Sequence, residues 1–263
     1  MPHDWLMPDW PAPATVRALC TTRSGGVSTG PYESLNLGDH VGDAPAAVQA
    51  NRQVLQQALG VRPVFLQQLH GRQVATLDAQ TPDGTPADGC MTQSPGVACT
   101  IMVADCLPVL FTNRQGSAVA AAHAGWRGLA GEGGRGVLES TVESFRVLAH
   151  AGTGDGATEI VAWLGPCIGP EQFEVGPEVK AAFEAHDPQA AACFRPHPGG
   201  KWLADLAGLA RRRLQASGIT SIHGNDGSAP WCTVSNPSRF FSHRRDTLAL
   251  GGSGRLAACI WLA

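Results

Sequence analysis

The sequence predicts a mixed α+β (α/β) fold in which helices and a mixed sheet pack as a sandwich. Apolar runs that end in turn residues predict strands, and segments whose apolar residues recur at helical spacing predict helices. The two kinds of segment alternate irregularly along the chain, which favours a mixed sheet. Apolar residues make up 43% and charged residues 16% of the 263 residues, as in ordinary folded proteins. We therefore expect one domain spanning residues 1–263.

The N-terminal part of the chain predicts a strand, a long loop and a helix. Apolar and β-branched residues predict a strand over Val16–Thr22. The following segment, residues 24–43, is rich in glycine and turn residues, and loops of this length inside a compact domain are usually functional. A packing helix is expected to begin near Asp43 and Pro45 and to end before Gly60.

The middle of the chain predicts buried strands. Two apolar runs, Ala98–Phe111 and Ser117–Ala124, are joined by the turn residues Asn113–Gly116. Their length and continuity favour paired antiparallel strands that are buried on both faces. Further strands are expected over Ile160–Leu164 and, near the end of the chain, over Leu256–Trp261.

Two more helices are expected in the second half of the chain. Apolar residues at helical spacing predict one helix over Val137–Ala149 and another over Leu203–Ala216, with Gly218 as a stop signal. Neither pattern carries residues typical of catalysis, so both are interpreted as packing helices.

Charge and cysteine usage exclude several classes of protein. The formal net charge is -3 and no run of Lys and Arg occurs, which argues against nucleic acid as a partner. The first residues lack the basic and apolar regions of a signal peptide, and no window has the apolar length of a membrane span. The eight cysteines include no C-x-x-C pair, so reduced thiols are expected. We therefore expect a cytoplasmic monomer without a membrane partner.

Three polar residues stand where apolar strands are predicted to end. Cys106 lies two residues before Pro108, which is poorly tolerated inside a paired strand, so the cysteine is expected near a strand irregularity or end. His123 ends the next strand, and His70 follows the apolar run at residues 64–66 and precedes a glycine. An unpaired buried polar group costs about 1–3 kcal/mol, so polar residues in such positions need a partner or a function.

His70, Cys106 and His123 together form a ligand set that suits zinc. Three protein ligands leave a fourth tetrahedral position for water or substrate, which is the catalytic rather than the structural arrangement. The alternative is that the histidines are hydrogen-bonded surface residues and that the cysteine is inert core. Spacing alone does not bring the three side chains together, so both interpretations stay open on the residues alone.

Several neighbouring residues have both a functional and a structural interpretation. Asp105 points to the face opposite Cys106 in a strand and is expected to cap a turn or bind an arginine rather than act as a base. Arg127 can hold a phosphate or carboxylate, or stack on Trp126. The cationic, aromatic segment 240–246 is either an anion site or a salt-bridged surface, and the rigid loop Gly165–Pro170 is suited to close over a ligand.

Eight segments in this order resemble the YfiH-type family along almost the whole chain: TTRSGGVS, SLNLGDHVGD, QLHG, ADCLPVLF, AAHAGWRG, WLGPCIGP, FEVG and FFSHRRD. Members of this family are called multicopper polyphenol oxidase or laccase-domain proteins, and also purine nucleoside phosphorylases. The resemblance implies a layered α-β-β-α sandwich with mixed sheets. It also implies that His70, Cys106 and His123 form the catalytic metal site.

The resemblance further implies a zinc-dependent (Zn²⁺) enzyme that uses phosphate to cleave adenosine, inosine and 5′-methylthioadenosine, and that deaminates adenosine. Arg127 or Arg244 would hold the phosphate, and Arg23 and Asn36, which lie in matching segments, are further candidates for binding substrate. The H-x-E and P-C-x-x-C signature of other zinc deaminases is missing, so deamination would need a different proton carrier.

Two alternatives within the resemblance are kept. A His₂Cys set can also bind copper (Cu²⁺), as the polyphenol oxidase (laccase) name suggests. The nine histidines are scattered without an H-x-H pair, however, which disfavours a multicopper cluster. The other alternative is a peptidoglycan-editing amidase that removes L-Ser from UDP-MurNAc-L-Ser, with Cys106 as a metal-free nucleophile.

Two loops are longer than the resemblance leads one to expect, at residues 129–135 and 248–253. We expect both to border the site and to influence the choice of substrate.

Overall fold

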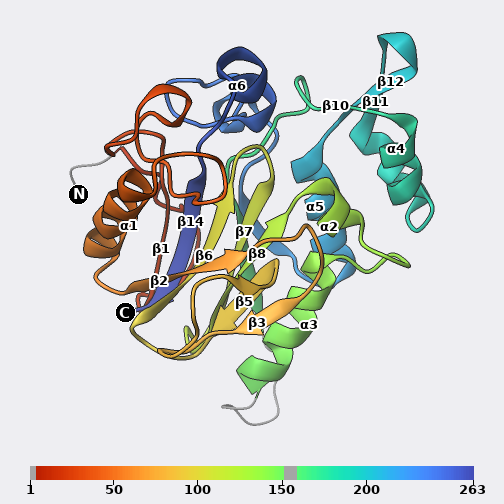
Figure 1. Ribbon diagram of the computed structural model, residues 1–263. Helices are drawn as coiled ribbons and strands as arrows, with labels where there is room; N and C mark the ends of the chain where they lie inside the picture. Colours follow the sequence, from red (N-terminus) through yellow and green to blue (C-terminus); the bar gives the residue numbers. More distant parts are fainter. Residues whose placement is uncertain (1–3, 151–158) are drawn as a thin grey trace.

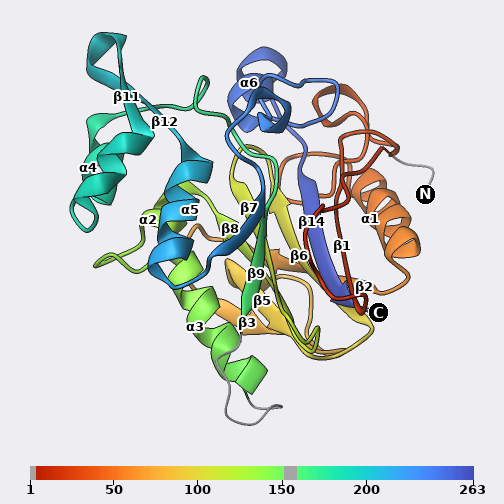
Figure 2. The same cartoon turned by 180° about the vertical axis from the view of Figure 1, so that it is seen from behind.

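The computed structural model describes residues 4–150 and 159–263, which form two sheets packed face to face with helices on both outer faces (Figure 1). Helix α1 (Pro45–Leu59) covers the outer face of one sheet, and α3 (Val137–His150) and α5 (Leu206–Ala216) cover the outer face of the other (Figure 2). The predicted layered α-β-β-α sandwich is confirmed.

The first sheet has five strands, and both parallel and antiparallel pairs occur in it. Its order is β1 (Val16–Cys20), β14 (Leu256–Leu262), β6 (Val97–Val103), β2 (Arg62–Gln67) and β4 (Thr85–Pro86). The predicted first strand is therefore shorter than expected and ends at Cys20.

The second sheet has six strands and is also mixed. Its order is β13 (Ser221–Gly224), β9 (Ile160–Leu164), β7 (Leu107–Asn113), β8 (Val119–Ala124), β5 (Gly89–Thr92) and β3 (Val74–Thr76). A three-stranded sheet lies beside the sandwich together with α4 (Pro177–Glu184) (Figure 1). Its order is β10 (Glu174–Val175), β12 (Lys201–Ala204) and β11 (Phe194–His197).

The central strands are apolar throughout because both of their faces are buried. In β6, Cys99 and Ile101 point between the two sheets, whereas Ala98 and Met102 point toward the layer that contains α1. This alternation follows from the two-residue period of a strand. A strand buried on both faces therefore appears in the sequence as a continuous apolar run.

The apolar run predicted as one strand over Ala98–Phe111 is two strands, and this prediction was wrong. Strand β6 belongs to the five-stranded sheet and β7 to the six-stranded sheet, so the chain crosses between sheets at residues 104–106. Asp105 makes the crossing with a left-handed backbone, φ 84°. The expected antiparallel pairing of β7 and β8 is confirmed, with Pro108 opposite His123.

Helix α1 has the predicted bounds, and α3 ends one residue beyond the predicted end. Helix α5 begins at Leu206, not at Leu203, because Leu203 pairs within β12 and Asp205 caps the helix by accepting the Gly208 N–H. Leu203 matched the helical spacing by coincidence, since strand residues can be apolar as well.

Three short helices among the described residues were not predicted as helices. Helix α2 (Trp126–Ala130) follows the strand that carries His123, α4 follows the Gly165–Pro170 loop and β10, and α6 (His243–Leu250) lies in the cationic segment. Four 3-10 turns complete the described structure: η1 (Gly30–Tyr32), η2 (Pro188–Cys193), η3 (Pro198–Gly200) and η4 (Ala229–Trp231). All eight cysteines are free thiols, as expected. In the described ranges no helix combines the length and apolarity needed to cross a membrane.

Candidate active site

His70, Cys106 and His123, called the triad below, meet at one end of the sandwich. They come from the loop after β2, from the crossing between β6 and β7, and from β8. Their potential ligand atoms all lie within 4.8 Å of one another. Cys106 Sγ lies 3.8 Å from His70 Nε2, and the two imidazole rings are 4.8 Å apart between centroids. Tertiary structure thus brings together three side chains whose contact the sequence did not determine.

His123 is held by a buried carboxylate. Its side chain is buried in β8, and its Nδ1 lies 2.9 Å from Oδ1 of Asp88, which is 1% exposed. A carboxylate accepts a hydrogen bond, so Nδ1 carries the proton and Nε2 offers its lone pair to the site. A histidine ligand whose second nitrogen is bonded to a carboxylate is common at metal sites.

The same Asp88 carboxylate also holds the loop that carries His70. It accepts the backbone N–H groups of Leu69, His70 and Gly71 at 3.0, 2.9 and 2.7 Å. One carboxylate therefore positions two members of the triad.

Sequence reasoning missed Asp88. The signal was an acidic residue directly before Gly89, at the start of the buried strand β5. A buried acid in such a position needs several donors, and here they come from elements distant in the sequence.

Two glycines allow the chain to approach the triad closely. A Cβ atom at Gly125 would lie 2.9 Å from Cys106 Sγ and 2.9 Å from His70 Cδ2. A Cβ atom at Gly128 would lie 2.9 Å from the Gly71 carbonyl oxygen. The Gly-Trp-Arg-Gly segment forms the start of helix α2 and packs closely against the triad.

Asp105 links the crossing between the sheets to α6. Its carboxylate accepts hydrogen bonds from Thr233 Oγ1 at 2.5 Å, Ser242 Oγ at 3.1 Å and the Arg244 N–H at 2.7 Å. The predicted capping role is confirmed. Asp105 and His70 are also the non-glycine residues with positive φ among those described, and such backbone strain tends to collect at functional sites.

The triad forms a tightly coupled set of ionisable groups. Burial alone would raise the pKa of the Cys106 thiol, but His123 and His70 outweigh it and lower that pKa to about 6. Burial alone would lower the pKa of His123, but the charges of Cys106 and Asp88 raise it to about 9. Burial opposes ionisation of Asp88 too, yet hydrogen bonds from His123 and Gly71 hold its pKa below the usual value. Without a metal the site favours a thiolate beside an imidazolium.

The donor set fits a metal ion. A thiolate and two imidazoles are soft to borderline ligands that suit zinc or copper. The Asp88 bond fixes which nitrogen of His123 faces the site, and the glycine at 125 keeps the space around Cys106 Sγ and His70 free of a Cβ atom. The triad could therefore hold one metal ion with three protein ligands.

Three cavities border the triad. The cationic cavity, of about 310 Å³, is lined by the whole triad and by the polar side chains of His40, Gln68, His243 and Arg255. The apolar cavity, of about 170 Å³, is lined by Cys106, His243 and Arg244 together with Trp126, Ile168, Phe173 and Leu206. The Trp126 cavity, of about 420 Å³, is lined by His70, Arg72, Arg127 and Glu132 among others.

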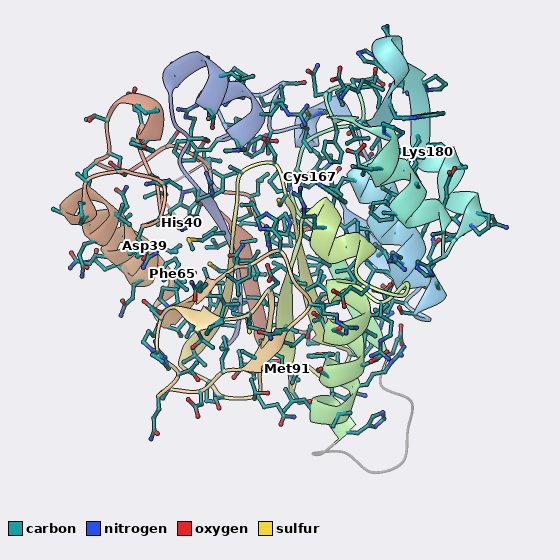
Figure 3. The ribbon with its side chains drawn as sticks, turned by 45° about the vertical axis from the view of Figure 1, so that its right-hand side comes forward. Asp39, His40, Phe65, Met91, Cys167 and Lys180 are labelled. Atoms are coloured by element: carbon teal, nitrogen blue, oxygen red, sulfur yellow. The ribbon has the colours of Figure 1, made fainter. Side chains whose placement is uncertain are left out.

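The cationic cavity borders a further hollow on the side of α1, where Asp39, His40 and Phe65 lie together (Figure 3). Lys180, on α4, lies on the opposite side of the molecule (Figure 3). Gln68 lines both the cationic cavity and this hollow, and its side chain is held in place by hydrogen bonds. Its amide donates to the Met102 carbonyl and accepts the Met102 N–H, both at 2.8 Å.

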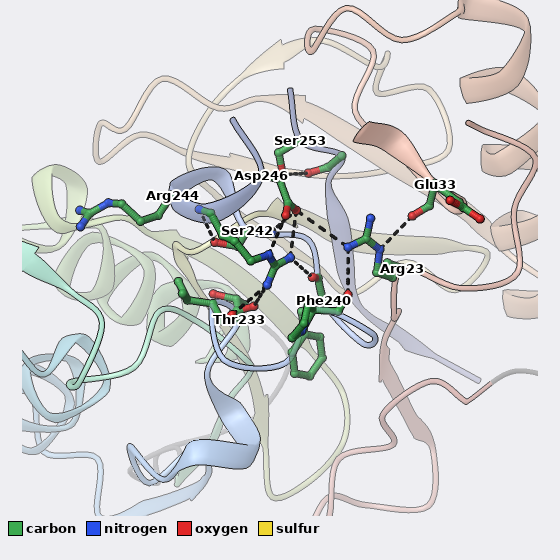
Figure 4. A network of polar contacts seen from close by, with 12 residues as sticks. Arg23, Glu33, Thr233, Phe240, Ser242, Arg244, Asp246 and Ser253 are labelled. Atoms are coloured by element: carbon green, nitrogen blue, oxygen red, sulfur yellow. Dashed lines mark hydrogen bonds and ion pairs between the residues drawn. The ribbon is translucent and has the colours of Figure 1, made fainter. Parts of the chain in front are cut away.

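Arg127 and Arg244, the two arginines expected to bind phosphate, both line cavities at the triad. The Arg127 guanidinium lies over the Trp126 ring, 4.5 Å from its centroid. Arg244 borders the apolar cavity, and its guanidinium donates to the Glu174 carbonyl at 3.1 Å. In Figure 4 the side chain of Arg244 points away from the polar network around Asp246.

Arg23 and Asn36, the other two candidates, do not line any of the three cavities. Arg23 donates to the carbonyls of Glu33 and Pro237, both at 2.9 Å, within the network drawn in Figure 4. Asn36 is fully buried, and its amide donates to Gly38 O at 3.1 Å. Both side chains hold loops together beside the site.

The loops singled out in the sequence contribute unequally. Residues 130–132 of the lengthened loop 129–135 line the Trp126 cavity, so this loop borders the site as expected. Residues 248–253 line none of the three cavities, although Arg255, two residues further on, lines the cationic cavity. The Gly165–Pro170 loop contributes Ile168 to the apolar cavity.

Sequence reasoning also missed Arg255 as a site residue. It precedes the last apolar strand, β14, and a cation at the start of a buried strand was the available signal.

Known proteins resemble this chain over nearly its whole length. The family model described as multi-copper polyphenol oxidoreductase laccase matches residues 17–263. A purine nucleoside phosphorylase of Pseudomonas aeruginosa is 51% identical over 98% of both chains, and the purine nucleoside phosphorylase YfiH of Escherichia coli is 48% identical over the same shares. Among solved structures, a Neisseria meningitidis protein has a TM-score of 0.85 at 47% identity, covering 98% of this chain and 99% of its own. YlmD of Geobacillus stearothermophilus has a TM-score of 0.88 at 31% identity, covering 100% and 97%.

Proposed function

This chain belongs to the multi-copper polyphenol oxidoreductase laccase family, in which relatives are named purine nucleoside phosphorylase, and on that premise we propose that it cleaves purine nucleosides with phosphate. Adenosine, inosine and 5′-methylthioadenosine are the proposed substrates, and zinc held by the triad is the proposed cofactor. The observation that carries the proposal is the pair of cavities on either side of Cys106, one apolar and one cationic. A reaction between a purine nucleoside and phosphate needs two such neighbouring sites.

The apolar cavity supports binding of the purine. Ile168, Phe173 and Trp126 offer apolar and aromatic surface against which a flat base is desolvated and stacked. Arg127 and Arg244 stand beside the triad as donors for polar groups of the substrates. A bound zinc ion supplies Lewis acidity at the open side of the triad.

His243 is the proposed proton donor to the leaving base. In phosphorolysis a phosphate oxygen bonds to C1′ of the ribose while the bond from C1′ to the base breaks, and the departing base takes up a proton. His243 borders both cavities, and its Nδ1 lies 3.0 Å from Thr247 Oγ1. Its Nε2 is therefore the nitrogen available to the base. The same residue would serve as the proton carrier in deamination of adenosine, which we propose as a second reaction of this site.

We infer that residues 1–263 act as one catalytic domain. The walls of the cationic cavity come from residues as distant in the sequence as His40 and Arg255. A fragment lacking either end would leave that cavity incomplete.

Metal analysis followed by a nucleoside panel with and without phosphate tests the proposal. We expect about one zinc ion per chain, release of free base only when phosphate is present, and loss of that activity on chelation with recovery on adding zinc. A Cys106→Ala protein that folds and keeps full activity would refute the metal site. Copper in place of zinc, together with oxidation of phenols, would instead support the oxidase name.

A second candidate is amide hydrolysis by Cys106, as in the editing of UDP-MurNAc-L-Ser. One observation favours it: the depressed pKa of Cys106, beside His123 and Asp88, creates a nucleophilic thiolate when no metal is bound. Release of serine by the metal-free protein, without turnover of nucleosides, would support this reaction over phosphorolysis.

A further inference from the structure

We infer that Arg255 forms the binding site for the phosphate co-substrate, in the cationic cavity that the triad lines. The inference rests on the proposed phosphorolysis and places its second substrate, phosphate, in the cationic cavity. It differs from the assignment to Arg127 or Arg244 that the sequence suggested.

The three cavities differ in how well they suit an anion. No carboxylate lines the cationic cavity, where Arg255 stands among histidines. The Trp126 cavity is lined by Arg72 and Arg127, but Glu132 lines it too, forms an ion pair with Arg72 at 3.9 Å and would repel an anion there. The walls of the apolar cavity are mostly hydrocarbon and include the Asp105 carboxylate. Charge therefore favours the cationic cavity for a phosphate dianion.

The Arg255 guanidinium forms no ion pair with a carboxylate in the described part of the chain, although the charges of Cys106 and Asp105 act on it. Its Nη1 donates to the carbonyls of Ser253 and Gly254 at 2.9 and 3.0 Å. Within residues 4–150 and 159–263, no acceptor bonds its Nε or Nη2 and no carboxylate forms an ion pair with it. Arg255 is partly buried, and the two nitrogens of its planar guanidinium that bond no protein acceptor, Nε and Nη2, match two oxygens of phosphate.

The loop of residues 34–43 packs against Arg255 and holds its backbone in position. Asn36 Oδ1 accepts the Arg255 N–H and the Gly38 N–H, both at 2.9 Å. A Cβ atom at Gly38 would lie 2.7 Å from Arg255 Cγ, so only glycine lets the side chain lie against this loop. Asn36 is therefore a positioning residue that acts through Arg255, which explains why it lies outside the cavities.

The site places phosphate where the reaction needs it. The cationic and apolar cavities share Ala104, Cys106 and His243 as walls. With the base in the apolar cavity, the ribose spans these shared walls, and C1′ faces the phosphate. An oxygen of phosphate then forms the bond to C1′, and the bond to the base breaks with its electron pair leaving on the base.

The test is direct binding of inorganic phosphate to the zinc-loaded protein, by calorimetry and without nucleoside. We expect Arg255→Gln to weaken phosphate binding by about tenfold or more, as for the loss of a charge-assisted fork. In turnover, KM for phosphate should rise while KM for the nucleoside changes far less. Arg17→Gln is the matched control, because Arg17 is exposed on β1 and lines none of the three cavities, and it should change phosphate affinity by less than about threefold.

Equal phosphate affinity of Arg255→Gln and wild type, or a larger loss in Arg127→Gln, would overturn the inference. Circular dichroism and zinc content establish that each variant folds. If Arg255→Gln does not fold, NMR of the wild-type protein with ¹⁵N-labelled arginine is the second test. The Nε resonance of Arg255 is identified by its absence from the spectrum of Arg255→Lys. Phosphate should shift this resonance, and the absence of a shift would reject the site.

Failure of the inference can be told apart from failure of the proposed function. Wild-type protein that binds phosphate through Arg255 but releases no base contradicts phosphorolysis alone. Normal phosphorolysis with unchanged phosphate affinity in Arg255→Gln contradicts the phosphate site alone.

Discussion

The two histidines of the triad are held by different kinds of structure. His123 lies inside β8, is 3% exposed, and has Pro108 as its strand partner. His70 lies on an exposed loop after β2 with a left-handed backbone, φ 59°. The strand fixes His123 by pairing and packing, whereas hydrogen bonds to a single carboxylate, that of Asp88, fix the loop of His70.

This difference separates the requirements for folding from those for function. The side of the site at His123 is part of the core between two sheets, so a change there affects stability and chemistry together. The side at His70 is joined to the core by Asp88, so a change there affects chemistry far more than stability. Variants of these residues test that separation.

Replacing His123 by Ala is expected to have the largest effect. It leaves Asp88 buried without its imidazole and opens a cavity, which costs about 2–4 kcal/mol in the free energy of unfolding. The protein should also lose zinc and phosphorolysis. Urea unfolding and metal analysis check both effects. A variant with wild-type stability would contradict the role of His123 in the core.

Replacing His70 by Ala is expected to abolish activity and zinc binding with little effect on stability. The side chain is exposed and the backbone bonds to Asp88 remain, so the free energy of unfolding should fall by less than about 1 kcal/mol. The same urea titration, run beside that of His123→Ala, measures the contrast. Equal destabilisation by the two variants would remove the distinction between strand and loop.

Replacing Asp88 by Asn should weaken the hydrogen bonds that hold both His123 and the loop of His70. The amide keeps the shape but provides one acceptor oxygen, so the three loop N–H groups and His123 compete for it. Zinc affinity should fall about 10- to 100-fold, as for other residues that orient ligands. Competition with a chromophoric chelator measures this affinity, and Asp9→Asn, an exposed carboxylate, serves as the control.

Gly125→Ala should displace the triad with a smaller effect. The added Cβ would lie 2.9 Å from Cys106 Sγ, so the sulfur or the imidazole of His70 must move. We expect zinc affinity to fall by about tenfold, as small displacements of ligands do. Gly71→Ala is the matched control, because its Cβ would lie 3.5 Å from the nearest atom, Asp88 Oδ2.

Arg23→Gln should have the smallest effect on turnover. The variant loses bonds to the Glu33 and Pro237 carbonyls, which we expect to lower the free energy of unfolding by about 1–2 kcal/mol. Because Arg23 lies outside the cavities, KM for phosphate and for nucleoside should change by less than about twofold. Steady-state kinetics checks this, and a large rise in either KM would place Arg23 in contact with substrate.

Much of the fold was predictable because local patterns carry it. Pro45 and Gly60 mark the ends of α1, and the continuous apolar runs of β7 and β8 are typical of strands buried on both faces. The bounds failed where tertiary contacts override local pattern. Asp105 divides one apolar run into strands of different sheets because its carboxylate bonds residues more than a hundred positions away.

The candidate site was only partly predictable. The ligand residues stand out as polar interruptions at strand ends, and that signal is local. Asp88 and Arg255 were missed because their local signals are weak: the role of a buried acid or cation depends on the groups that surround it. Those groups come from distant parts of the chain.

The sequence by itself determined that helices and a mixed sheet form a sandwich, and it determined the chemical types of the candidate metal ligands, since strand period and residue chemistry are local properties. Only the tertiary structure decided that the three candidate ligands meet within 4.8 Å and that Asp88 holds two of them. It also decided that Arg255, which forms no ion pair with a carboxylate among the described residues, lines the same cavity. The physical reason is that desolvation and hydrogen bonding depend on which surfaces are brought together, and folding alone brings them together.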